Sequence, residues 1–136
     1  MPSASDLLGD RRRVLVTGGA GFIGGAVVRR LLRETKVTVF NLDKMGYASD
    51  LSSIEEVLIE LGDAANNRHR LQKVDLTDAA AVEAAVHEAD PDLVMHLAAE
   101  SHVDRSISGP GVFIESNVNG TYNLLQAAEP LRGLER

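Results

Sequence analysis

Three glycines spaced three apart have the clearest chemical use in this sequence. Gly18, Gly21 and Gly24 follow the short apolar run 14–16. A strand that turns at once into a helix needs a residue free to take unusual backbone angles and a turn with no side chain in a ligand's way, and Gly18 and Gly21 meet these needs. Gly24 lets the helix lie close to the strand, and the unpaired N–H groups of the first helical turn attract phosphate. The pattern predicts a pyrophosphate site; a tight turn without a ligand is the alternative.

An acidic residue at the end of the next apolar run supports the dinucleotide interpretation. Residues 37–42 predict a second strand, and Asp43 ends it. Asp43 stands roughly 20 residues beyond Gly24, where a carboxylate usually binds the adenosine ribose hydroxyls. It would repel a 2′-phosphate, which favours NAD over NADP. As an alternative, Asp43 is simply a solvated residue at a strand end. The positive charge of the neighbouring Lys44 weakens the expected repulsion of a 2′-phosphate.

The composition indicates one globular domain. The chain has 136 residues, 44% hydrophobic and 25% charged, a net charge of −6 and no cysteine. The absence of cysteine excludes disulfides and cysteine-based zinc sites and fits a reducing cytoplasm. The negative net charge argues against a nucleic-acid surface. No run is long enough for a signal peptide or a membrane span. We expect residues 1–12 to be a flexible extension and residues 13–136 an incomplete NAD-binding domain without a substrate domain.

Other arrangements of chemically active residues are weaker. No two histidines have the i, i+4 spacing of a helical zinc site, so no metal site is predicted; they are His69, His87, His96 and His102. Glu100 and Asp104 are spaced as an acid/base pair, although Asp104 also suits a helix N-cap. Ser101 and His102 are adjacent and do not form a nucleophile–base pair.

Strand and helix patterns alternate along the chain. The first strand, at 14–16, is followed by the helix after the glycines. We expect further strands at 37–42, 71–74 and 93–97, and the last of these should be buried on both faces. We expect further helices at 51–61, from an N-cap at Thr77 to Pro91, and at 111–129. Residues 44–49 and 64–69 are predicted to be loops. The fold class predicted is α/β, a Rossmann-like doubly wound parallel sheet truncated after about four strands.

Two helices should have apolar faces. The helix after the glycine turn should bury a stripe made of Phe22, Ile23, Val27, Val28, Leu31 and Leu32. The last helix should present a common face made of Ile114, Val118, Thr121, Leu125 and Ala128. That second face is either wholly core or partly an interface between subunits.

Three segments resemble a known family. Residues 17–24, 41–44 and 96–107 look like the extended short-chain dehydrogenase/reductases. The glycine motif is shared across that superfamily, whereas the run from Ala98 to Ile107 is more specific and looks like the dTDP-glucose 4,6-dehydratase family. The resemblance extends from Arg13 to about Ala128. It departs after Asp43, where the family usually has Thr-Tyr-Ala-Gly-Asn and this chain has Gly46-Tyr47-Ala48-Ser49-Asp50.

The resemblance implies roles for particular residues. Asp43 and Lys44 would hold the adenosine ribose, and Ser101 would face the sugar nucleotide. Phe22 and Ile23 would contact the pyrophosphate through their amides. The remaining residues implied to contact NAD are Asp75 and Leu76 beside the adenine, Leu97, Ala98 and Ala99 beside the nicotinamide, and Ser116 from the last helix.

The resemblance also implies a reaction, conversion of dTDP-glucose to dTDP-4-keto-6-deoxyglucose by internal hydride transfer and loss of water. The family's catalytic residues are a Tyr-x-x-x-Lys pair and a Thr-Asp-Glu group. Neither tyrosine of this chain, Tyr47 or Tyr122, has lysine four residues later, so no catalytic residue is predicted and the chain alone should be inactive. We expect the NAD-binding part of a longer enzyme, which could form a homodimer; the alternatives are a nucleotide-sugar 4-epimerase and a non-catalytic dinucleotide-binding module.

Overall fold

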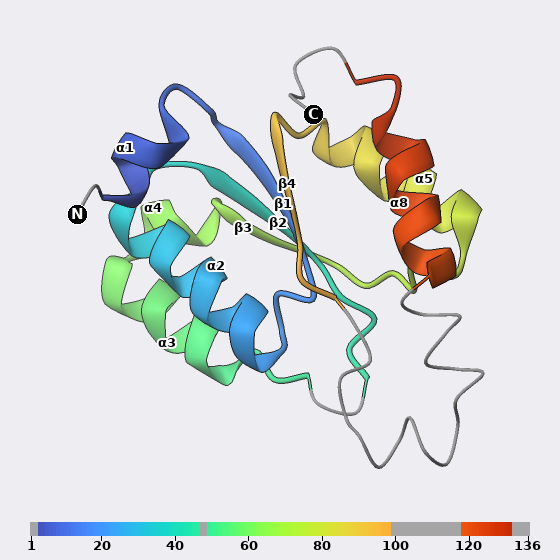
Figure 1. Ribbon diagram of the computed structural model, residues 1–136. Helices are drawn as coiled ribbons and strands as arrows, with labels where there is room; N and C mark the ends of the chain where they lie inside the picture. The colour runs from blue at the N-terminus through green and yellow to red at the C-terminus, as the bar shows by residue number, and fades with distance from the viewer. Residues whose placement is uncertain (1–2, 47–48, 99–117, 132–136) are drawn as a thin grey trace.

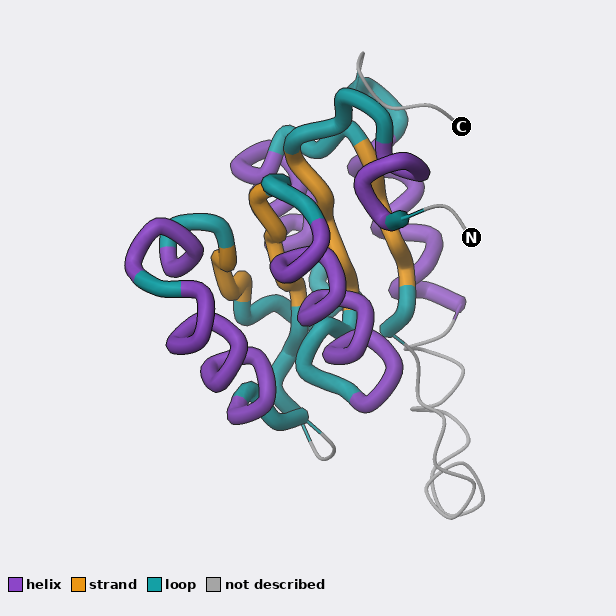
Figure 2. Tube along the Cα trace, turned by 90° about the vertical axis from the view of Figure 1, so that its left-hand side faces the viewer, coloured by secondary structure: helices purple, strands orange, loops and turns teal. Residues whose placement is uncertain are grey.

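One parallel sheet of four strands forms the centre of the molecule (Figure 1). The computed structural model describes residues 3–46, 49–98 and 118–131. In these residues the strand order is β3-β2-β1-β4 and every pairing is parallel. The strands are β1 (Arg13–Thr17), β2 (Thr38–Leu42), β3 (His69–Gln72) and β4 (Leu93–His96). Their carboxyl ends therefore lie along one edge, the lower one in Figure 2.

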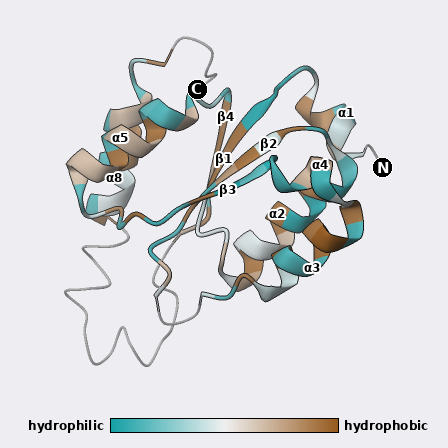
Figure 3. Ribbon diagram, turned by 180° about the vertical axis from the view of Figure 1, so that it is seen from behind, coloured by the Kyte–Doolittle hydropathy of each residue, from teal (hydrophilic) through white to brown (hydrophobic). Residues whose placement is uncertain are grey.

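Helices cover both faces of the sheet, as Figure 3 shows from behind. α2 (Phe22–Glu34) and α3 (Ser52–Leu61) cover one face, α5 (Ala79–Ala89) and α8 (Gly120–Ala128) cover the other, and the short α4 (Asp63–Asn66) follows α3. Successive strand residues point to opposite faces. Val14 and Val16 pack with α2 and α3, whereas Leu15 packs with α5 and α8. This explains why β1 is a continuous apolar run, and it confirms the predicted α/β fold class.

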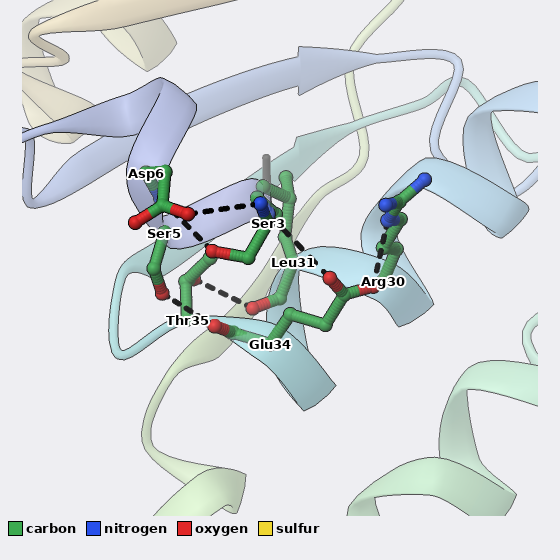
Figure 4. A network of polar contacts seen from close by, with 8 residues as sticks. Ser3, Ser5, Asp6, Arg30, Leu31, Glu34 and Thr35 are labelled. Carbon is green, nitrogen blue, oxygen red and sulfur yellow. Dashed lines mark hydrogen bonds and ion pairs between the residues drawn. The ribbon is translucent and has the colours of Figure 1, made fainter. Parts of the chain in front are cut away.

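The N-terminal residues form a short helix where the sequence predicted a flexible extension. α1 (Ala4–Leu8) begins with a capping box in which Ser3 and Asp6 exchange hydrogen bonds. Ser5 donates to the carbonyl of Glu34 at the end of α2 (Figure 4). Leu8 is buried in the core on the α2 side of the sheet. The Ser-x-x-Asp capping box and Leu8 are the sequence features that produce this helix.

The buried stripe predicted for α2 is wrong at its first turn. Phe22 is 94% exposed and Ile23 66% exposed, while Val27 is half-buried. The buried residues of the helix are Gly24, Gly25, Val28, Leu31 and Leu32. The reason is that α2 begins beyond the edge of the sheet, so its first turn has no strand to pack against.

Four further details of the helices and strands differ from the prediction. β3 runs from His69 to Gln72 rather than from 71 to 74. The N-cap of α5 is Asp78, which accepts a hydrogen bond from the N–H of Ala81, rather than Thr77. The residues of β4 are half-buried rather than buried on both faces, because β4 is the outer strand of the described sheet. Residues 64–66, expected in a loop, belong to the short helix α4.

Within the described residues, the face predicted for the last helix is not wholly core. Gly120 and Leu124 are buried, and Ala127 packs against the core. Val118 and Leu125 are 60% and 64% exposed. The earlier half of the predicted helix, including Ile114, lies outside the described residues. Among the residues that the structure describes, no helix is long and apolar enough to cross a membrane.

Candidate functional site at the carboxyl edge of the sheet

The predicted site residues follow directly on the ends of three strands. Gly18 follows β1, Asp43 follows β2, and Leu97 follows β4. Because β1 pairs with both β2 and β4, these three residues lie on neighbouring strands. In open α/β sheets ligands bind outside the carboxyl ends of the strands. The fold therefore places these residues where a ligand is expected.

The turn after β1 depends on Gly18. This residue has φ of +73°, a conformation that favours glycine, and its N–H donates to the carbonyl of Leu42 at 2.8 Å. A Cβ at this position would lie 2.7 Å from the Cα of Ala98, so the turn also passes against the backbone that leaves β4. Gly18 therefore brings the ends of β1, β2 and β4 into backbone contact.

The start of α2 is packed against the same turn. A Cβ on Gly24 would collide with the carbonyl oxygen of Gly18 and lie 2.7 Å from its carbonyl carbon. The N-cap residue, Gly21, has no side chain to cap the helix. The first N–H groups of a helix have no partner within it and carry partial positive charge. An exposed first turn at Phe22 and Ile23 therefore has the chemistry of an anion site.

Asp43 connects the glycine turn to the loop after β2. Its side chain is 7% exposed. Oδ2 accepts from the N–H of Ala20 at 3.1 Å, and Oδ1 accepts from the N–H of Met45 at 2.7 Å and from the hydroxyl of Ser49 at 2.8 Å. The N–H of Asp50 donates to the carbonyl of Ala20 at 2.8 Å. The carboxylate thus has a fixed orientation beside the turn.

Asp75 and Leu76 follow β3 and differ in exposure. The backbone N–H of Thr77 donates to the carboxyl group of Asp75 and lowers its pKa. Partial burial raises this pKa, whereas the hydroxyl of Thr77 and the positive charge of Lys44 lower it. Leu76 is buried, and its carbonyl accepts a hydrogen bond from Asn123 of α8. Asp75 therefore stays ionised close to Lys44, while the Leu76 side chain belongs to the core.

A hydrogen-bond network that the sequence analysis did not predict connects β1, β4 and α8. The hydroxyl of Thr17, a fully buried residue, accepts from the N–H groups of Leu97 at 3.0 Å and Ala98 at 3.1 Å. Its oxygen lies 2.6 Å from Nδ1 of His96, whose Nε2 lies 2.8 Å from the hydroxyl of Thr121. The network fixes the backbone at the two residues that the resemblance places beside the nicotinamide.

The contacts of Thr17 determine the protonation of His96. With two N–H groups already donating to it, the Thr17 oxygen directs its own proton to His96 Nδ1. Neutral His96 then carries its proton on Nε2 and donates it to Thr121. Burial lowers the pKa of His96 below its ordinary value of 6.5, which favours this neutral form. The one signal for the network in the sequence is a histidine, His96, within the strand predicted at 93–97.

Asn41 lies beneath the glycine turn. It is fully buried, its Oδ1 has no hydrogen-bond partner among the described residues, and a Cβ on Gly19 would collide with that oxygen. Its Nδ2 lies 3.2 Å from Nε2 of His69, and burial lowers the pKa of that histidine. Asn41 therefore supports the turn from beneath, and His69 lies beside Asn41.

Three predicted contacts lie outside the described residues: Ala99, Ser101 and Ser116. Within the residues that the structure describes, no group of three or more acidic or histidine side chains could hold a metal ion. What the described residues bring together is a helix N-terminus, a buried carboxylate and a fixed strand end.

Comparison with known proteins identifies the family. A model of the GDP-mannose 4,6 dehydratase family matches residues 15–135. The chain belongs to this family. The match covers the glycine turn, all four strands except the first two residues of β1, and α8. The residues matched by the family model therefore include the elements that form the site.

Individual relatives and solved structures are similar to this chain over most of its length. The dTDP-glucose 4,6-dehydratase of Neisseria meningitidis serogroup B is 52% identical over 117 residues, which is 86% of this chain and 31% of that protein. A double mutant of DesIV, a dTDP-glucose 4,6-dehydratase from Streptomyces venezuelae solved with NAD and DAU bound, has a TM-score of 0.75 and 41% identity over 90% of this chain and 37% of its own.

A second solved structure has a different activity. The UDP-glucose 4-epimerase of Thermus thermophilus, in complex with NAD, has a TM-score of 0.67 and 37% identity over 85% of this chain and 33% of its own. The chain therefore spans about a third of the length of these three proteins.

The close contact at Gly24 predicts a difference between two adjacent glycines. Gly24→Ala should lower the free energy of unfolding by roughly 2–3 kcal/mol, because the added methyl meets the Gly18 backbone. Gly25→Ala is the matched control. Its Cβ would be no closer than 3.4 Å to the end of the Arg29 side chain, and alanine is favoured in a helix by about 0.5–1 kcal/mol. Urea denaturation of both variants measures this; equal losses would contradict the packing.

The burial of His96 predicts a pH dependence of stability. Above its ordinary pKa of 6.5 the side chain is neutral in both folded and unfolded chains, and its contribution to stability is fully present. As the pH falls below that value the unfolded chain takes up the proton first, so stability is lost. The fall in Tm between about pH 7.5 and about pH 5.5 should be smaller in His96→Gln than in the wild type.

The matched control for this pH experiment is His87→Gln, on the exposed side of α5. His69 is half-buried and burial lowers its pKa too, so it contributes in the same direction and part of the pH dependence should persist in His96→Gln. A pH dependence that His96→Gln and His87→Gln leave equally unchanged would rule out the neutral network.

Proposed function

We propose that this chain is the NAD-binding part of a dTDP-glucose 4,6-dehydratase. The observation that carries the proposal is the position of Asp43, a buried carboxylate at the end of β2 that accepts from the N–H of Ala20 in the glycine turn. A pyrophosphate at the start of α2 and a ribose at Asp43 are the two contacts that a dinucleotide needs from this edge. The 52% identical relative is a dTDP-glucose 4,6-dehydratase, which supports the choice of reaction.

Residues at the ends of all four described strands would hold the cofactor. The N–H groups of Phe22 and Ile23 would bind the pyrophosphate, beside the glycine turn formed by Gly18, Gly21 and Gly24. Asp43 and Lys44 would bind the adenosine ribose, with Asp75 and Leu76 on the adenine side. Leu97, Ala98 and Ala99 would lie beside the nicotinamide, together with Ser116 and with Ser101 facing the sugar.

When bound, NAD would supply the hydride acceptor and donor for the reaction proposed, in which the sugar loses water. The part of this chain in that reaction is binding and orientation. The Thr17 hydroxyl holds the N–H groups of Leu97 and Ala98, so the backbone beside the nicotinamide cannot shift without breaking two hydrogen bonds. Fixed placement of a reacting group is itself a large contribution to rate.

A nucleotide-sugar 4-epimerase is the second candidate. It is supported by the 37% identity to the UDP-glucose 4-epimerase of Thermus thermophilus, a structure in complex with NAD. The dehydratase is preferred because identity to the Neisseria dehydratase is 52% over 86% of the chain. A non-catalytic dinucleotide-binding module is the third, and it shares the cofactor site with both.

The site predicts a preference for NAD over NADP. NAD at about 100 times its dissociation constant should stabilise the chain by roughly 2.7 kcal/mol, whereas the 2′-phosphate of NADP would meet the Asp43 carboxylate. Asp43→Asn should weaken NAD binding roughly tenfold or more, as expected for loss of a hydrogen bond to a charged group. Thermal melts with each nucleotide measure this, with Asp63→Asn on the exposed start of α4 as the control. Equal stabilisation by NAD and NADP would contradict the role of Asp43.

The catalytic prediction is that the purified chain does not convert dTDP-glucose. Neither of its two tyrosines is followed four residues later by lysine, and the chain contains no Thr-Asp-Glu run. A turnover assay with dTDP-glucose and NAD, followed by the absorbance of the keto sugar product, should show no reaction even when a melt shows that NAD is bound. Turnover by this chain would overturn the prediction and require other catalytic residues.

A further inference from the structure

The carboxylate of Asp43 has little acceptor capacity left. A carboxylate offers about four lone-pair positions, two on each oxygen. Oδ1 receives both the N–H of Met45 and the hydroxyl of Ser49, and Oδ2 receives the N–H of Ala20. Among the described residues these are its partners. One position, on Oδ2, therefore remains for a ligand.

A ribose presents two hydroxyl donors, on neighbouring carbons. Asp43 alone cannot accept both while Met45 and Ser49 occupy Oδ1. The oxygen of Ser49 supplies a further acceptor beside Asp43, because its proton points to Asp43 at 2.8 Å and its lone pairs are not used by any described residue. Ser49 is half-buried, so a ligand can reach it.

The backbone around Ser49 holds it beside the glycine turn. Its N–H donates to the carbonyl of Gly46 at 3.2 Å, and the next N–H, that of Asp50, donates to Ala20 at 2.8 Å. Ala20 also donates its own N–H to Asp43. Ser49, Asp43 and the glycine turn are thus connected through both side chains and backbone.

We propose that Ser49 is a second ribose-binding residue of this chain. One ribose hydroxyl donates to Oδ2 of Asp43, and the other donates to Oγ of Ser49, which continues to donate its own proton to Oδ1. The inference rests on the proposed function, since it assumes a dinucleotide at this edge. It is particular to this sequence, because the run typical of the family has glycine, with no hydroxyl, where this chain has Ser49.

Calorimetric titration of the 136-residue chain with NAD tests this pairing. Ser49→Ala should weaken NAD binding roughly threefold to tenfold, the effect of losing one neutral hydrogen bond. Ser49→Thr keeps the hydroxyl and should restore most of the affinity. Ser53→Ala, which removes an exposed hydroxyl in the first turn of α3, is the matched control and should bind NAD as the wild type does.

Analogues of NAD without one adenosine ribose hydroxyl test the contact itself. For one of the two, the 2′-deoxy or the 3′-deoxy compound, wild type and Ser49→Ala should bind with equal affinity, because the hydroxyl that Ser49 accepts is already missing. A merely structural role of Ser49 would lower the affinity for NAD and for both analogues by the same factor. That pattern, or NAD binding by Ser49→Ala that is unchanged or tighter, would overturn the inference.

The same titrations separate this inference from the proposed function. Failure of the wild type to bind NAD would overturn both. NAD binding that Asp43→Asn weakens and Ser49→Ala does not would overturn only the role of Ser49. Thermal melts without ligand show whether each variant is folded, so a loss of affinity is not mistaken for unfolding.

Discussion

The close approach of two backbones at the end of β1 is the constraint on which the rest of the site depends. Gly18 passes so near Ala98 that a Cβ would not fit, and Thr17 just before it holds the N–H groups that leave β4. A buried hydroxyl without partners would be costly, so Thr17 requires β4 in this register. The turn, the sheet pairing and the strand end beside the proposed nicotinamide position are therefore one connected structure.

Asp43 extends this constraint to the next strand. A carboxylate that is 7% exposed needs donors, and the glycine turn and the following loop supply them through Ala20, Met45 and Ser49. The orientation of the carboxylate is therefore set before any ligand binds. A preorganised acceptor costs a ligand less to bind than one that must be ordered at that moment.

The sequence predicted the features that follow from backbone rules and missed those that depend on surroundings. The glycine turn, the α/β class and the position of Asp43 follow from spacing along the chain. Periodicity placed Phe22 and Ile23 in the core, because it cannot show that the first turn of α2 lies beyond the sheet. The choice of Asp78 over the neighbouring Thr77 as N-cap, and the pairing of Thr17 with His96, depend on contacts that no local pattern contains.

The physical origin of the site explains why dehydratases and an epimerase resemble this chain in the same region. The features that shape the edge are backbone features, namely a positive φ, a helix start and two strand ends, and none of them refers to a particular sugar. Any enzyme that holds a dinucleotide here must keep them, whatever its reaction. Residues such as Ser49, whose side chain adds to the edge without being needed to form it, are free to differ, and it is at such positions that members of one fold can tune how the same cofactor is held.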